Sequence, residues 1–235
     1  MFVTAVALGL WQGVVWLTGL PAFLLPDPRR VAGALWSARD EVIAAAGVTS
    51  AEIILGFATG TTLGMAAALA CMSGRLRAAI LPMLTLSQTV PIFALAPILT
   101  LWLGYGMAPK IAVVALIVMF PVAAALADGL LNPAPVHLEL ARSMGATRWQ
   151  ELRVIRLPSS RPHLATGLRI AAVYAPVGAV IGEWVGGSEG LGAMMIQANG
   201  RMKTDLVFAA LFITVALSLM FRTGVGLLCD RLARP

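Results

Sequence analysis

Charged side chains are scarce in this chain, which carries 12% charged and 59% hydrophobic residues. Soluble domains carry about 25% charged residues, so this chain has too little polar surface to cover a water-soluble core of its size. The composition predicts an integral membrane protein. A helical span needs about 20 apolar residues, so the length allows about five to seven spans. A single transmembrane domain over residues 1–235 is therefore expected.

Residues and motifs that form catalytic, metal-binding or nucleotide-binding sites are also scarce. Cys71 and Cys229 have no CxxC spacing, so we interpret both as small apolar packing residues. His137 and His163 lie 26 residues apart with no HExxH register, so no metal site is expected. The chain has no GxxxxGK[ST] phosphate loop and is not expected to hydrolyse nucleotide. We therefore predict no catalytic residue, no bound cofactor and no metal.

The distribution of charge argues against a cleaved secretory signal and against nucleic-acid binding. Residues 1–26 contain no charged side chain, so they lack the basic segment that opens a secretory signal, and an uncleaved first helix is expected. The net charge of +6 comes from basic residues between apolar runs, without an aromatic stripe beside them. Nucleic-acid binding is therefore not expected.

Apolar runs bounded by charges or by Pro and Gly turns predict about six membrane-spanning helices. The third and fourth are expected to form a helical hairpin, because the short segment Gly104-Tyr105-Gly106 joins them. The six spans are placed near residues 2–20, 53–73, 79–103, 110–131, 164–185 and 206–228.

Glycine and proline patterns within these spans suggest close packing and a solute pathway. The second and fifth spans have a glycine at every fourth position, which allows helices to approach closely, either within the chain or at a dimer seam. Proline breaks backbone hydrogen bonds, which is tolerated in a membrane where protein or a watery cavity satisfies the carbonyls. The glycines are Gly56, Gly60, Gly64, Gly178, Gly182 and Gly186, and the prolines are Pro82, Pro91, Pro97 and Pro121.

The loop over about 132–163 carries five arginines against two glutamates. Cytoplasmic loops carry an excess of Lys and Arg, so this loop is expected to face the cytoplasm. The loops 21–52 and 186–205 have no net positive charge and are expected on the outer face. Both termini are then cytoplasmic.

A polar segment within the cytoplasmic loop, residues 139–158, has a distinctive spacing: E-x-A-x-x-x-G, nine residues, then I-x-L-P. The matched positions are Glu139, Ala141, Gly145, Ile155, Leu157 and Pro158.

This segment predicts two short helices. The first ends in a sharp turn at Gly145, and the second is capped by Thr147 and stopped by Pro158. An apolar face is expected to fill a groove on a partner. The alternative is an amphipathic loop on anionic lipid. The face consists of Leu140, Met144, Trp149 and Leu152.

The spacing resembles the EAA loop of type I ABC importer permeases. The resemblance implies alternating access driven by two copies of a partner ATPase, which uses the ATP. It also implies a periplasmic or lipid-anchored solute-binding protein, a second permease copy and surrounding membrane lipid. Leu140 replaces the usual alanine, which is expected to alter the fit. The implied docking residues are Glu139, Ala141, Met144, Gly145, Ala146, Trp149, Ile155, Leu157 and Pro158.

Similarity to the nitrate/sulfonate/taurine branch of these permeases extends over nearly the whole chain. Residues 25–31 (LPDPRRV) and 91–121 resemble that branch. Residues 174–192, YAPVGAVIGEWVGGSEGLG, and the following ANGRMKTDLVFAAL resemble members assigned to thiamine precursors of the hydroxymethylpyrimidine type. The implied solute is such a pyrimidine, and sulfonate, taurine, nitrate or riboflavin-like solutes are the alternatives.

Polar residues near the predicted spans are candidates for the solute pathway. Glu183 is charged near the outer end of the fifth span, and such groups usually face a cavity or a partner; the alternative is a carboxylate hydrated at the membrane edge. Asp128 and Arg169 are interpreted as a mutual ion pair or as snorkelling side chains. The other candidates, suited to a small planar polar solute, are Gln88, Thr89, Pro91, Phe93 and Tyr174.

Two other functional classes fit less well. An integral membrane enzyme acting on lipid head groups would use Arg142, His163 and Glu139. It requires polar residues from at least two loops, and only one loop is rich in them. A secondary transporter is disfavoured by the lack of mid-span Asp or Glu and of an inverted repeat.

Overall fold

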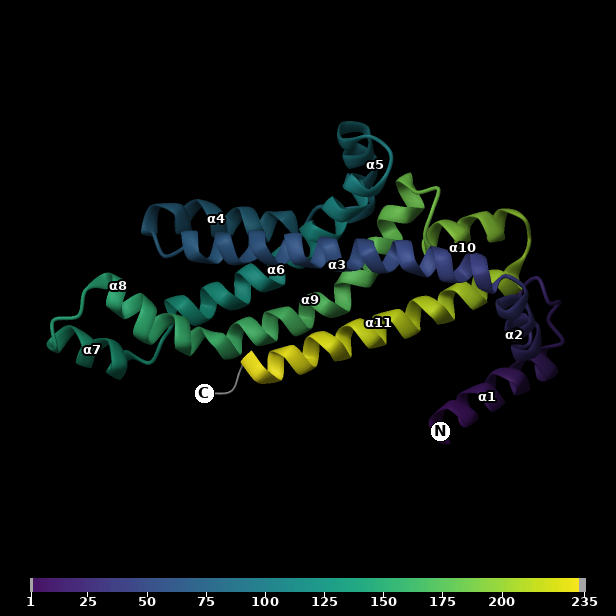
Figure 1. Ribbon diagram of the computed structural model, residues 1–235, viewed down its shortest axis with the longest axis horizontal. Helices are drawn as coiled ribbons and strands as arrows, with labels where there is room; N and C mark the ends of the chain where they lie inside the picture. The colour runs from purple at the N-terminus through teal and green to yellow at the C-terminus, as the bar shows by residue number, and fades with distance from the viewer. Residues whose placement is uncertain (1, 233–235) are drawn as a thin grey trace.

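The computed structural model describes residues 2–232, which contain helices and loops and no strand. Figure 1 shows an elongated bundle in which α3, α6, α9 and α11 run along the long axis. The helices are α1 Phe2–Thr18, α2 Pro28–Ser37, α3 Arg39–Ala70, α4 Gly74–Ser87, α5 Ile92–Leu103, α6 Met107–Leu131, α7 Pro135–Ser143, α8 Arg148–Gln150, the π-helical segment Glu151–Arg156, α9 Leu157–Gly186, α10 Leu191–Gly200 and α11 Thr204–Leu232.

Within residues 2–232, four helices are long and apolar enough to cross a membrane. They are α3, α6, the continuous helix Arg148–Gly186 and α11, and the bent pair α4 and α5 makes a fifth span if counted as one. The remaining expected span, α1, has 17 residues, at the lower limit for a crossing helix. The all-α membrane fold predicted from the sequence is confirmed.

The third expected span, 79–103, is not one helix. It divides into α4 and α5, whose axes differ by 104° across residues 88–91. Pro91 lacks a backbone donor and disfavours helical backbone at Val90, so the helix ends there. The hairpin turn at Gly104–Gly106 is as predicted, because α5 ends at Leu103 and α6 begins at Met107.

Helix α3 begins earlier than expected. Residues 39–52, interpreted above as part of an outer loop, form its first turns, and α2 precedes it. Asp40 and Glu41 lie in the first turn of α3, where acidic side chains favour the helix dipole. The prediction that Glu52 belongs to a loop is therefore wrong, and its side chain is fully buried.

Helix α6 lies at the centre of the bundle, between α3 and α9. A Cβ atom at Gly60 of α3 would lie 2.6 Å from the Ala115 carbonyl oxygen of α6, and one at Gly178 of α9 would lie 3.1 Å from Val114 Cα. Val118 of α6 is fully buried. Both glycine strips thus provide packing within the chain, and the dimer-seam alternative for them is wrong.

The expected stop at Pro158 is also wrong, because the second short helix continues into α9. The π-helical segment Glu151–Arg156 joins them, and the Leu157 amide donates to the Leu152 carbonyl. Pro158 lies just after this π-helical segment, where the change from π-helical to α-helical bonding accommodates a residue without an amide donor.

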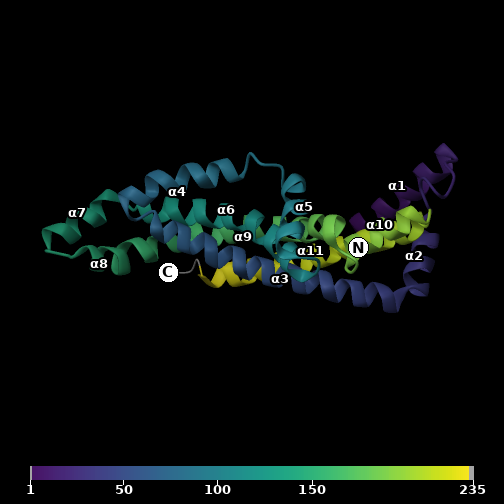
Figure 2. The same ribbon diagram turned by 90° about the horizontal axis from the view of Figure 1, so that it is seen from above.

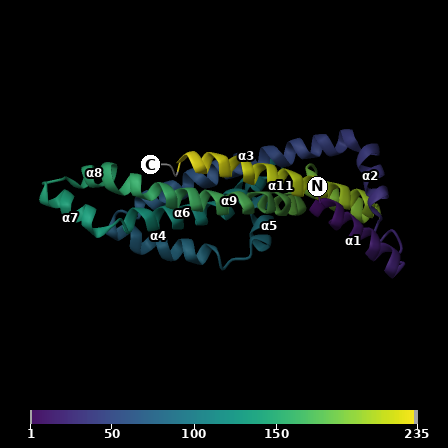
Figure 3. The ribbon, with the colours of Figure 1, turned by 90° about the horizontal axis from the view of Figure 1, so that it is seen from below.

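The two ends of the bundle differ, as Figures 2 and 3 show. Helices α7 and α8 project at one end, here called the α7–α8 end. Helices α2 and α10 lie at the other, here called the α10 end, and α2 runs across the long axis there. Helix α1 lies beside α11 at this end, where Trp11 stacks on Phe208 with ring centroids 5.9 Å apart.

Candidate functional site

The α7–α8 end forms a compact projection, here called the knob, over residues 135–158. Gly145 ends the first short helix with a φ of +75°, the left-handed region that favours glycine. The Ala146 amide donates to the Ala141 carbonyl at 2.9 Å across this turn. The turn predicted at Gly145 is confirmed.

The second short helix begins with a capping box. The Gln150 amide donates to Thr147 Oγ1 at 3.3 Å, and the Thr147 amide donates to Gln150 Oε1 at 2.8 Å. Both bonds satisfy backbone donors that the helix start leaves free. Thr147 therefore caps this helix, as predicted.

A charged cluster ties the knob to two membrane helices. Arg142 Nε donates to Glu151 Oε1 at 3.0 Å, and Arg156 lies 3.8 Å from the other carboxylate oxygen. Arg156 Nη1 also donates to the Leu130 carbonyl, at the end of α6, at 2.7 Å. The hydrogen bond to Glu151 and the charge of that carboxylate raise the pKa of Arg142 above its usual value, so Arg142 stays charged. The cluster links α7 to the start of α9 and to α6.

Large apolar side chains cover the outside of the knob. Met144 is 78% exposed and Trp149 is 66% exposed, and Leu140 and Val154 are exposed as well. Such apolar surface indicates an interaction site. Leu152, expected on this face, instead packs against the buried cluster of α3 and α6, because the continuous helix directs it inward. A cavity of about 440 Å³ lies between α7 and the start of α9; Leu140, Ala141, Met144, Val154, Ile155 and Pro158 contribute to its wall.

The structure places all nine predicted docking residues on the knob. Six are exposed: Glu139, Met144, Gly145, Trp149, Leu157 and Pro158. Three are half-buried: Ala141, Ala146 and Ile155.

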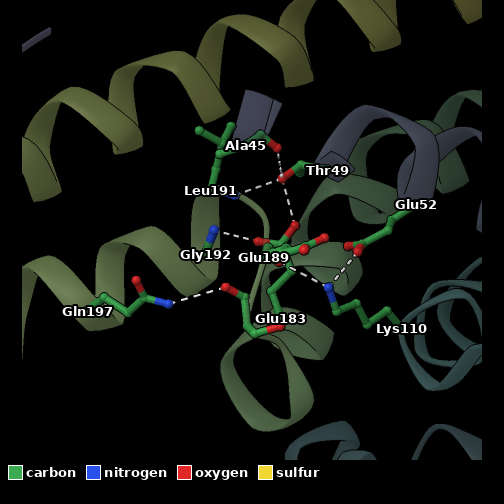
Figure 4. Close-up of polar contacts among 10 residues, drawn as sticks. Ala45, Thr49, Glu52, Lys110, Glu183, Glu189, Leu191, Gly192 and Gln197 are labelled. Carbon is green, nitrogen blue, oxygen red and sulfur yellow. Dashed lines mark hydrogen bonds and ion pairs between the residues drawn. The ribbon is translucent and has the colours of Figure 1, made fainter. Parts of the chain in front are cut away.

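A second polar site lies at the α10 end, around Glu183 (Figure 4). The Glu183 side chain is fully buried. Thr49 Oγ1 donates to its Oε1 at 2.6 Å, and the Gly192 amide donates to its Oε2. The Leu191 amide donates to Thr49 Oγ1 at 2.9 Å. The alternative of a hydrated carboxylate at the membrane edge is therefore wrong.

Glycine is required beside this carboxylate. A Cβ atom at Gly190 would lie 2.1 Å from Glu183 Oε1, and Gly190 has a φ of +109°. A Cβ atom at Gly192 would lie 2.7 Å from Oε2. The glycines thus allow the loop after α9 to close over Glu183.

A buried ion pair lies next to Glu183 and was missed from the sequence. Lys110 Nζ of α6 lies 2.7 Å from Glu52 Oε1 of α3, and their side chains are 5% and 0% exposed. Lys110 Nζ also donates to the Glu189 carbonyl at 3.0 Å. The available signal was an isolated charge in each apolar segment. The pair also places a buried carboxylate, Glu52, well inside α3, whereas no Asp or Glu was expected in the middle of a span.

Comparison with known proteins identifies the fold and the family. A family model described as "Binding-protein-dependent transport system inner membrane component" matches residues 60–234. The chain belongs to this family of ABC transporter permeases. It is therefore a multi-pass inner-membrane permease subunit without catalytic activity, and the alternative of a lipid head-group enzyme is wrong.

Three curated relatives match the permease over most of their length. A probable ABC transporter permease protein of Haemophilus influenzae is 44% identical over 98% of this chain and 95% of the relative. The formylaminopyrimidine transport permease protein ThiX of Halalkalibacterium halodurans is 36% identical over 90% of this chain and 85% of the relative. The riboflavin transport system permease protein RibX of Chloroflexus aurantiacus is 35% identical over 95% and 85%.

Solved structures show the same fold as the permease. A chain from an amino acid ABC transporter crystallised with histidines has a TM-score of 0.69 at 17% identity, covering 84% of this chain and 96% of that chain. A chain from an inward-facing MetNI methionine ABC transporter has a TM-score of 0.65 at 19% identity, covering 85% and 98%. The predicted type I ABC importer permease fold is confirmed.

The permease does not gather its predicted pathway residues into one buried site. Gln88, Thr89 and Pro91 are exposed at the break between α4 and α5. Phe93 follows in α5, with its ring centroid 6.2 Å from that of Trp184. Tyr174 is half-exposed on α9, and Glu183 is buried.

Two charged residues of the permease have partners other than those expected. Arg169 pairs with Asp230 of α11. Asp128 lies 3.6 Å from His163 and accepts from Asn132 at 2.8 Å. The alternative of a mutual Asp128–Arg169 ion pair is wrong, because the end of α11 lies beside Arg169. Among residues 2–232, no group of three or more His, Cys, Asp or Glu side chains could hold a metal ion.

Proposed function

We propose that this permease imports a small polar solute, with a thiamine-precursor pyrimidine as the first candidate. Import proceeds by alternating access through one membrane domain over residues 1–235. A partner ATPase uses the ATP, and this chain binds no cofactor. Sulfonate, taurine, nitrate and riboflavin-like solutes are the alternatives.

The solute proposal is supported by the relatives. The names of ThiX and RibX specify formylaminopyrimidine and riboflavin, which are both nitrogen heterocycles. Both relatives share more than a third of their aligned residues with this chain. Of the predicted pathway residues, Phe93 and Tyr174 offer aromatic rings and Gln88 an amide, which suit a planar heterocycle. The other three predicted pathway residues are Thr89, Pro91 and Glu183.

The exposed apolar side chains of the knob support the proposal that it binds a partner ATPase. Met144 and Trp149 are large apolar side chains exposed on a rigid, capped turn. Two helices meeting at a turn match helix-in-groove recognition. The five arginines of residues 132–163 favour a cytoplasmic location, and both termini are proposed to lie on that side.

The Arg142–Glu151–Arg156 cluster gives the knob a route to the membrane helices. When nucleotide draws two ATPase copies together, each knob moves with its ATPase. The cluster passes that movement to α9 and α6, because Glu151 joins α7 to the start of α9 and Arg156 binds the end of α6. Two permease copies in surrounding lipid then open toward a periplasmic or lipid-anchored binding protein.

Reconstituted uptake tests this function. Proteoliposomes containing the permease and its ATPase, supplied with the binding protein, are expected to accumulate labelled hydroxymethylpyrimidine only with ATP. Accumulation that needs neither ATP nor the ATPase would contradict the importer proposal. ATP-dependent uptake of taurine but not of the pyrimidine would contradict the solute proposal alone.

A further inference from the structure

The buried cluster at the α10 end consists of Thr49, Glu52, Lys110 and Glu183. One hydrogen-bond acceptor in it, Glu52 Oε2, has no donor within the described part of the chain. Glu183 accepts from Thr49 and from the Gly192 amide, one donor at each oxygen. Lys110 donates to Glu52 Oε1. Glu52 Oε2 is buried and has no hydrogen-bond partner among residues 2–232. Buried polar atoms are nearly always paired, so an unpaired carboxylate oxygen indicates a missing donor.

Glu52 forms part of the wall of a cavity of about 480 Å³. This volume lies within the range of about 300–1,000 Å³ typical of small-molecule sites. Lys110, Trp184 and Tyr105 also line it, together with the backbone of residues 186–189. Tyr105 is 89% exposed and lies at the rim. The cavity therefore combines two aromatic rings with a buried charged pair.

The charges select the kind of ligand. Glu52 and Glu183 are two carboxylates, and Lys110 is the one ammonium bonded within this cluster. A ligand with an N–H group would donate a hydrogen bond to the free Oε2 of Glu52. A planar ring would lie against Trp184 and Tyr105, since aromatic rings favour offset or edge-to-face contacts.

We infer that this cavity is a solute subsite for an amino-substituted nitrogen heterocycle. The Glu52 side chain is fully buried in this structure, so binding turns its carboxylate toward the cavity, where Oε2 accepts from the amino group. The ring lies between Trp184 and Tyr105. Lys110 keeps its bond to Glu52 Oε1 and holds the carboxylate in position. This inference rests on the proposed function, because it assigns that solute a place in the permease.

Binding measurements on the permease–ATPase complex in lipid nanodiscs test the subsite. The probes are 4-amino-5-hydroxymethyl-2-methylpyrimidine and the same ring without its amino group. Calorimetry is expected to give about 10-fold tighter binding of the amino probe, the effect of one hydrogen bond to a charged group. Glu52→Gln is expected to remove this preference.

A second variant separates loss of binding from loss of folding, because Glu52→Gln disturbs the buried Lys110 and can unfold the protein. Tyr105→Ala removes an exposed ring and is expected to weaken binding of both probes about 10-fold. Trp36→Ala is the matched control, because Trp36 is 73% exposed on α2 and lies outside this cavity. It is expected to leave binding unchanged.

Three results would overturn the subsite: no binding of the amino probe, equal affinity for the two probes, or unchanged affinity in Tyr105→Ala. In each case, ATP-dependent uptake by the same complex would leave the proposed function intact. Absence of ATP-dependent uptake, with the two probes still discriminated, would contradict the proposed function instead.

Discussion

At the residue scale, the bundle depends on a few buried polar groups whose partners are distant in the sequence. Lys110 pairs with Glu52, and Thr49 with Glu183. The isolated charges are visible in the sequence, but their pairing depends on α3, α6 and α9 lying side by side. The alternative of an Asp128–Arg169 pair was wrong for the same reason: two charges near the ends of consecutive spans need not be neighbours in space.

Removing Lys110 is expected to destabilise the permease. Lys110→Met leaves the Glu52 carboxylate buried without its counter-charge, which typically costs about 3–5 kcal/mol. Lys203→Met is the matched control, because Lys203 is exposed. Thermal unfolding of the detergent-solubilised protein, followed by size-exclusion chromatography, measures the difference. Equal midpoints for the two variants would show that the ion pair contributes nothing.

Gly190 is expected to tolerate no side chain. Gly190→Ala combines a positive φ with a Cβ atom 2.1 Å from Glu183 Oε1, so the loop after α9 must move. Gly200→Ala is the control, since a Cβ atom there meets nothing within 4 Å. The same unfolding assay is expected to give a lower midpoint for Gly190→Ala only. A shared midpoint would argue against the tight closure over Glu183.

At the element scale, turns and caps that depend only on neighbouring residues were predicted correctly. The Gly145 turn, the Thr147 cap and the Gly104–Gly106 hairpin follow from backbone preferences of neighbouring residues. The bend between α4 and α5 and the passage of α8 into α9 were missed. Each involves a proline whose effect depends on its position: Pro91 precedes a helix after a break, whereas Pro158 follows a π-helical segment within a continuous helix.

Gly145→Val is expected to uncouple transport while the protein still inserts. A non-glycine residue in left-handed backbone costs about 1–2 kcal/mol, so the turn and the apolar face of the knob shift. Gly33→Val on α2 is the control, because its position is open and has no positive φ. ATP-driven uptake in proteoliposomes is expected to fall more than about 10-fold in Gly145→Val only. Normal uptake by this variant would be hard to reconcile with docking through the knob.

At the scale of the whole molecule, composition was sufficient to predict a helical membrane protein, and the 139–158 spacing was sufficient to predict the family. The number of clear spans is lower than the six expected, because α1 is short and α4 and α5 are bent apart. The glycine strips face α6 and, at Gly186, Thr100 of α5 within the chain, so a second permease copy would contact other surfaces. Native mass spectrometry of the purified complex is expected to give two permease chains and two ATPase chains; a single permease chain would contradict the homodimer.

Site-specific crosslinking tests the central claim most directly, namely that a partner ATPase binds the knob. Both native cysteines, Cys71 and Cys229, are buried, so Met144→Cys and Trp149→Cys place unique exposed thiols on the knob. In inverted membrane vesicles these thiols are expected to crosslink to the ATPase, and in intact cells they should resist an impermeant thiol reagent. Labelling from outside the cell, or no crosslink to the ATPase in any nucleotide state, would contradict the account.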